Sequence, residues 1–153
     1  MGSVLEKVQL VKDESARIGE YLKTLSPEAW ATQSACDAWQ VSDVVAHLTG
    51  AVDRFGPNIV RGLAGDGSAP EGMPPAGVGD MAARLRANAQ VAIDFKESLG
   101  GEILAAYNDS RVRFDAVFAE VKEADKDKFC YHAAGTISIE TYLNLRITEL
   151  IVH

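Results

Sequence analysis

The sequence predicts an all-α protein, a four-helix bundle with one long crossover connection. Three observations predict this class. Apolar residues recur at alternating spacings of three and four along most of the chain, as they do on one face of a helix. No long segment alternates apolar and polar residues with the period of two that marks a strand. Capping residues or prolines stand at most of the predicted helix ends.

The first predicted helix begins near the N-terminus. Ser3 and Glu6 have the spacing of a capping box, and Pro27 ends the helix because proline disfavours helical geometry in the residue before it. The apolar stripe between them consists of Val4, Val8, Val11, Ser15, Ile18, Leu22 and Leu25. Residues 26–30 have a serine followed by proline and predict one short helical turn.

A second helix is predicted after Trp39. Its stripe consists of Val41, Val44, Leu48, Val52, Phe55, Ile59 and Leu63. We expect Gly56 and Pro57 to kink this helix or to split off its last turn. The next segment, Ala64 to Gly79, contains five glycines and three prolines, so we expect a surface loop that is either a plain connector or a mobile lid.

A third helical region begins at Asp80, a favourable capping residue. Its stripe is Met81, Leu85, Asn88, Ala92 and Phe95, and it resumes as Ile103, Tyr107, Ser110, Phe114, Val117 and Val121. We expect one long helical arm with a break at Gly100 and Gly101. Residues 129–135 should be irregular or briefly extended. Ser138 should cap a last helix whose stripe is Ile139, Leu143, Ile147 and Leu150.

Composition and charge exclude several kinds of partner. The chain has 153 residues, 47% of them hydrophobic, which suits one domain with a substantial core. A formal net charge of -7 without clustered Lys or Arg argues against nucleic acid and anionic membranes. No apolar run approaches the length of a membrane span. Cys36 and Cys130 lie far apart and fit no paired framework, so we expect reduced thiols and a cytoplasmic protein.

The candidate site is a metal centre formed by His47, Glu149 and His153. Glu149 and His153 are four residues apart, so on one helix they lie one turn apart and can share a metal. Tyr142 and Arg146 extend the same polar stripe. The alternative interpretation of this stripe is a face exposed to solvent. His47 flanks an apolar stripe, where it is either a hydrogen-bonded boundary residue or a ligand. Two imidazoles and one carboxylate form an open zinc site.

Three other features are weaker candidates. Cys36 is either a nucleophile near a helix start or a small residue packed beneath Trp39. Cys130 and His132 form a Cys-x-His pair that lacks further ligands nearby in the sequence. Trp30 and Trp39 are expected to fill the corner between the first two helices.

Two stretches resemble the signature motifs of a known family. Residues 39–48 read WQVSDVVAHL, residues 146–153 read RITELIVH, and residues 26–39 read SPEAWATQSACDAW. Together they resemble the mycothiol-dependent maleylpyruvate isomerase family, one of the DinB-like metal-binding bundles. The resemblance covers nearly the whole chain. Gln40 departs from it, because a Ser or Thr cap is usual at that position.

The resemblance implies a DinB-like bundle that holds a divalent metal through His47, Glu149 and His153. It also implies that the metal recruits the thiol of a small cofactor such as mycothiol and holds it as thiolate. The thiolate would add to an electrophile, giving isomerisation or S-transfer. Relatives continue past the position of His153, so we expect residues 1–153 to be a single bundle domain cut within or near the end of its last helix.

We therefore expect a metal-dependent enzyme, with zinc as the metal, that activates a low-molecular-weight thiol. The alternatives are a non-catalytic metal- or ligand-binding bundle and a metal-dependent hydrolase. A thiol enzyme needs cations for the carboxylate of its cofactor, and Arg54, Arg61 and Arg146 are the candidates. Arg146 is also a candidate contact to the substrate or to a metal ligand. The expected partners are a small thiol and a small electrophile, with a homodimer as one option.

Overall fold

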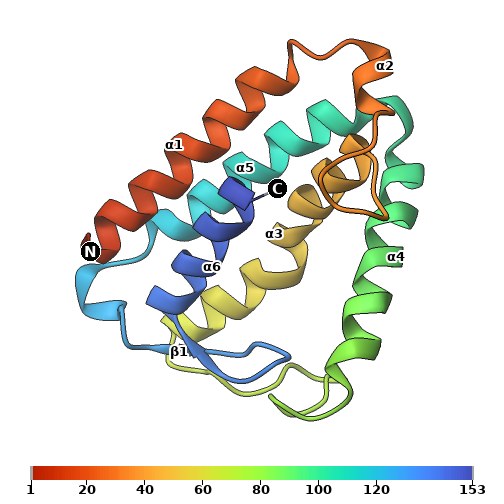
Figure 1. Ribbon diagram of the computed structural model, residues 1–153. Helices are drawn as coiled ribbons and strands as arrows, with labels where there is room; N and C mark the ends of the chain where they lie inside the picture. Colours follow the sequence, from red (N-terminus) through yellow and green to blue (C-terminus); the bar gives the residue numbers. More distant parts are fainter. Residues whose placement is uncertain (1, 153) are drawn as a thin grey trace.

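The computed structural model describes residues 2–152, which form a four-helix bundle with a fifth long helix on its outside (Figure 1). The bundle helices are α1 (Val4–Leu22), α3 (Val41–Leu63), α5 (Ile103–Ala119) and α6 (Ile139–Val152). The other elements are α2 (Pro27–Trp30), α4 (Met81–Leu99), the 3-10 turns Gly100–Glu102 and Glu123–Asp125, and strands β1 (Phe129–Cys130) and β2 (Ile137–Ser138). The predicted all-α bundle is confirmed.

The order of the helices produces the crossover. Helix α1 packs against α5 and α6, and α3 packs against the same two helices. In Figure 1, α1 and α6 run in one direction while α3 and α5 run in the other. Because the neighbours α3 and α5 are parallel, the chain must return along the length of the bundle between them. The long loop and α4 make that return, which is the predicted crossover connection.

The structure corrects the expectation of one helical arm from Asp80 to Val121. Helices α4 and α5 are separate and run in opposite directions (Figure 1), and they meet at Gly100, whose φ of 55° is left-handed. Helix α4 packs against α3, and of its 19 residues only Ala92 is buried. The continuous stripe misled the prediction because side-chain periodicity is the same whether or not the chain reverses.

Of the two alternatives expected at Gly56 and Pro57, a kink or a split-off last turn, the split is wrong. The helix runs from Val41 to Leu63 through both residues. Pro57 is exposed, and one proline removes only one hydrogen bond of the helix. Val52 and Ile59, on either side, are 5% and 1% exposed, so core packing holds the helix together across the proline.

The caps and the loop follow the prediction. Ser3, Asp80 and Ser138 each accept a hydrogen bond from the backbone N–H three residues later. Residues 64–79 contain turns and bends but no helix or strand. Strands β1 and β2 form a short antiparallel hairpin in which Cys130 pairs with Ile137.

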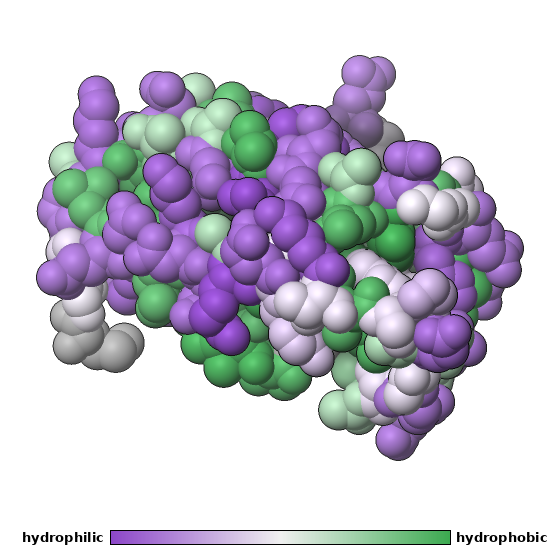
Figure 2. All heavy atoms as spheres, turned by 90° about the horizontal axis from the view of Figure 1, so that it is seen from above, coloured by the Kyte–Doolittle hydropathy of each residue, from purple (hydrophilic) through white to green (hydrophobic). Residues whose placement is uncertain are grey.

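On the face of the molecule shown in Figure 2, separate apolar patches alternate with hydrophilic side chains. Within residues 2–152, no helix is both long and apolar enough to cross a membrane.

Candidate metal centre

His47 stands on the second turn of α3, and the loop before that helix fixes its position. Gln33 donates from Nε2 to the carbonyl oxygens of Cys36 and Trp39, at 2.9 and 3.0 Å. Asp43 accepts the backbone N–H of Gln40 at 2.9 Å, which is the half of a capping box that the third residue of a helix provides. The ring of Trp39 then lies 5.1 Å from the ring of His47. From the sequence we expected Trp39 only to fill the corner between the first two helices, so this contact was not predicted.

Glu149 meets His47 from the opposite helix. The Oε2 atom of Glu149, on α6, lies 2.8 Å from Nε2 of His47, on α3. The two side chains are 41% and 19% exposed, so the pair sits at the edge of the bundle within reach of solvent. This distance is slightly shorter than the 3–5 Å expected of two ligands to one ion. The structure thus brings together two of the three predicted ligands.

His153, the third predicted ligand, lies outside the described residues. Across the described part of the chain, no group of three or more His, Cys, Asp or Glu side chains is arranged to hold a metal. The pair of His47 and Glu149 is therefore what the structure contributes to the proposed centre. Its donor atoms, one imidazole nitrogen and one carboxylate oxygen, are of the kinds that zinc takes.

Arg54 fixes the ring of His47 from the other side. Its Nη2 donates to the backbone oxygen of His47 at 3.1 Å and lies 3.4 Å from Nδ1 of the same ring. A guanidinium has no acceptor, so Nδ1 is the acceptor in this contact and the neutral ring carries its proton on Nε2. His47 then donates that proton to Glu149. Burial lowers the pKa of Arg54, and the charge of Glu149 acts in the opposite direction.

Arg146 is buried inside the bundle rather than presented to solvent. It is 6% exposed, and its guanidinium carbon lies 4.7 Å from the centre of the Phe114 ring. Burial lowers its pKa to about 10, while Tyr107 and Glu149 oppose that shift. Its Nε has no hydrogen-bond partner within residues 2–152. From this position Arg146 can interact electrostatically with Glu149, but its buried guanidinium is not presented to a cofactor in solution.

Arg61 is not brought to His47. The two residues are separated by fourteen positions on α3, which corresponds to about 21 Å along a helix. Arg61 instead donates to Asp66 at 2.7 Å and to Ser68 at 3.1 Å, at the start of the long loop. The structure therefore places Arg61 away from the pair of His47 and Glu149.

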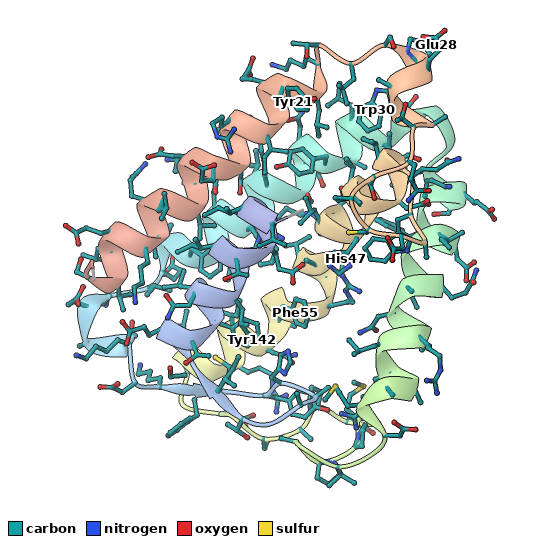
Figure 3. All side chains as sticks on the ribbon, viewed as in Figure 1. Tyr21, Glu28, Trp30, His47, Phe55 and Tyr142 are labelled. Atoms are coloured by element: carbon teal, nitrogen blue, oxygen red, sulfur yellow. The ribbon has the colours of Figure 1, made fainter. Side chains whose placement is uncertain are left out.

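The remaining candidates, Cys130, His132 and Cys36, are packed against other side chains. Cys130 is 0% exposed, and burial raises the pKa of its thiol to about 11. The ring of His132 stacks on Phe55 at 5.9 Å and meets Tyr142 edge-on, also at 5.9 Å. In Figure 3, Phe55 and Tyr142 lie on the facing helices α3 and α6. Cys36 is half-buried and packs with the apolar cluster around Leu48, as the packing interpretation expected.

A small pocket opens beside His47, between α3 and α4. Its volume is about 150 Å³, and His47 and Arg54 form part of its wall. Gly50 and Phe95 are close neighbours in this wall, since a Cβ on Gly50 would lie 3.5 Å from Cδ1 of Phe95. The sequence missed this pocket because the wall from α4 depends on how that helix packs, although Phe95 belongs to the stripe noted above.

Most of the chain matches one protein family. Residues 11–153 match the family described as "Mycothiol maleylpyruvate isomerase N-terminal domain". Among solved structures, the chain resembles one described as "Crystal structure of the mycothiol-dependent maleylpyruvate isomerase", with a TM-score of 0.70 and 17% sequence identity. The likeness covers 100% of this chain but 62% of that one, so the chain spans about three fifths of that structure's length. No curated protein matched the sequence.

Proposed function

The chain belongs to the family of mycothiol maleylpyruvate isomerase N-terminal domains, and we propose that it is a metal-dependent domain that activates a low-molecular-weight thiol. The thiol is mycothiol or a chemically similar compound, and the reaction is isomerisation or S-transfer of a small electrophile. Residues 1–153 act as a single bundle domain in this proposal.

The observation that carries the proposal is the contact between His47 and Glu149. Their donor atoms come from two helices, 102 residues apart in the sequence, and lie 2.8 Å apart. We assign them, together with His153, as the residues that would hold a divalent metal, with zinc as the first choice. When bound, such a metal lowers the pKa of a coordinating thiol and favours the nucleophilic thiolate.

The chain's own residues prepare this site in two ways. Trp39 and Arg54 restrict the ring of His47 from two sides, so its Nε2 keeps its direction toward Glu149. The half-exposed carboxylate of Glu149 leaves a route by which a ligand can approach from solvent.

Metal titration of the purified, metal-free protein tests the first part of the proposal. Zinc affinity measured by calorimetry should fall at least about 100-fold in His47→Ala, more than the 10–100-fold typical of outer-shell changes. His132→Phe is the matched control, because it removes a histidine but preserves an aromatic ring against Phe55 and Tyr142. Equal zinc affinity in the wild type and in His47→Ala would refute the metal assignment.

An activity assay tests the second part. The zinc-loaded protein is mixed with maleylpyruvate and with a panel of small electrophiles, in the presence and absence of mycothiol. Turnover that requires the thiol supports the proposed function. Turnover without any thiol would point to a metal-dependent hydrolase instead. Zinc binding without turnover under any of these conditions would favour the non-catalytic bundle.

A further inference from the structure

The side chain that faces Nδ1 of His47 is a hydrogen-bond donor. Nη2 of Arg54 lies 3.4 Å from Nδ1 and donates to the backbone oxygen of His47 at 3.1 Å. A guanidinium has no acceptor, so the lone pair of Nδ1 faces Arg54. The proton of the neutral ring is then on Nε2, 2.8 Å from the carboxylate oxygen of Glu149. The two neighbours of His47 therefore favour the same tautomer.

This tautomer is the opposite of the one that a metal ligand adopts. A neutral histidine that binds a metal through Nε2 carries its proton on Nδ1, and that N–H usually donates to a carboxylate, a carbonyl oxygen or water. In His47 a proton on Nδ1 would point at an N–H of Arg54, so two donors would meet across 3.4 Å. Arg54, in the position that it has here, therefore opposes the use of His47 as a ligand through Nε2.

Few contacts hold Arg54 in this position. Its Nε has no hydrogen-bond partner among residues 2–152, and none of the ion pairs in this part of the chain includes Arg54. Its guanidinium carbon lies 5.5 Å from the centre of the Phe55 ring, near the outer limit of a cation–π contact. The pocket between α3 and α4 adjoins both His47 and Arg54, so the guanidinium has room to turn away from Nδ1.

We propose that Arg54 is a positioning residue that controls whether His47 can act as a metal ligand. Arg54 holds the ring of the metal-free protein in the Nε2–H form and turns away from Nδ1 when the ring binds a metal. The assignment of His47 as a ligand is taken from the proposed function, on which this inference rests. Coupling of this kind is reciprocal, so the contact of Arg54 weakens metal binding and metal binding weakens the contact of Arg54.

The tautomer of His47 in the metal-free protein provides the first test. Long-range ¹H–¹⁵N correlation spectra of the labelled protein at pH 8 distinguish the Nε2–H form from the Nδ1–H form, and His47→Ala identifies the signals of this ring. We expect the Nε2–H form in the wild type. The Nδ1–H form would overturn the inference, because such a ring does not accept a hydrogen bond from Arg54.

Zinc affinity, measured by calorimetry, provides the second test. Arg54→Met keeps an unbranched side chain but removes the donor and the charge, so it should bind zinc about tenfold more tightly than the wild type. Arg61→Met is the matched control. It removes the same charge about 21 Å from His47 along α3, beyond the Debye length of about 10 Å, and should change the affinity less than about twofold.

The motion of the guanidinium provides the third test. Rotation about the Cζ–Nε bond of an arginine can be followed by NMR through its ¹³Cζ and ¹⁵N signals. Zinc should make this rotation severalfold faster in Arg54, which gives up its contact with Nδ1. It should leave Arg61 unchanged, because Arg61 donates to Asp66 at 2.7 Å and to Ser68 at 3.1 Å. Unchanged rotation of Arg54 on zinc binding would overturn the inference.

The zinc titration separates failure of the inference from failure of the proposed function. If the wild type binds zinc as tightly as Arg54→Met or more tightly, the inference is wrong and the metal assignment stands. If neither protein binds zinc, the metal assignment is wrong and the inference falls with it. Thermal unfolding of both metal-free proteins shows whether Arg54→Met is folded, and the tautomer of the wild type tests the inference without any variant of Arg54.

Discussion

At Gly62, α3 passes close to the β hairpin, and Gly62→Ala tests that packing. A Cβ at this position would lie 2.8 Å from the carbonyl oxygen of Phe129 and 3.2 Å from Cα of Cys130, and it would overlap Sγ of Cys130. Two of these atoms belong to the backbone, so no rotation of a side chain relieves the contact. Cys130 is itself 0% exposed and has no free space to move into.

The expected magnitude follows from two opposing effects. Alanine favours a helix over glycine by up to about 1 kcal/mol. Overpacking a filled core costs about 1–3 kcal/mol, and contacts with the backbone belong in the upper part of that range. We therefore expect Gly62→Ala to lower the free energy of unfolding by about 1–2 kcal/mol. For a domain of this length, that corresponds to a decrease in Tm of about 2–8 °C.

Urea and thermal denaturation of three proteins provide the test. Gly56→Ala, on the same helix, meets only Val52 and Val117 at 3.6 and 3.9 Å, so it should be neutral or stabilising by up to about 1 kcal/mol. Gly62→Ala should be the least stable of the three. If it unfolds at or above the wild-type midpoint, the helix and the hairpin are not packed as described.

Three further predictions concern titratable groups. At pH 8, iodoacetamide should modify Cys36 in the folded protein and leave Cys130 unmodified, because burial raises the pKa of Cys130 to about 11. Equal labelling of the two cysteines in a mass spectrum would contradict this prediction. Burial lowers the pKa of His132, so its contribution to stability is complete above the unfolded value of 6.5 and is lost as the pH falls through the folded value. The Tm should accordingly fall more between pH 7 and pH 5 in the wild type than in His132→Phe, and identical falls would count against it. Glu140→Ala should lower the Tm more than Lys7→Met, because it removes the carboxylate that lies 2.6 Å from the ammonium of Lys7. Lys7 is only 6% exposed, so its charge would then be buried without a partner. A larger decrease in Lys7→Met would contradict this reasoning.

Local features of the fold were predictable from the sequence, and chain direction was not. Ser3, Asp80 and Ser138 cap their helices as expected because a cap depends on residues three positions apart. The reversal at Gly100 was missed, since a stripe of apolar residues has the same spacing on one helix as on two. The sequence left open whether α3 continues through Pro57, because continuity depends on packing in the core rather than on the proline itself.

The candidate site shows the same division. His47 and Glu149 could be singled out because each is a polar residue beside an apolar stripe, and the structure brings them together. The guanidinium of Arg54 was a candidate for a different reason, and its contact with the ring of His47 depends on rotamers that no spacing predicts. The pocket wall at Phe95 required the position of α4, which is set by tertiary packing alone.

The marginal attachment of α4 has a consequence for how this protein can evolve. The helix supplies Val91 and Phe95 to the pocket, yet of its 19 residues only Ala92 is buried. Val91 is 49% exposed, so a change of its size or polarity alters the pocket with little effect on the core. Substitutions at such exposed positions of α4 can thus accumulate with little loss of stability while they change the lining of the pocket. The lining of the pocket on the α4 side and the stability of the core are therefore open to largely separate selection in this fold.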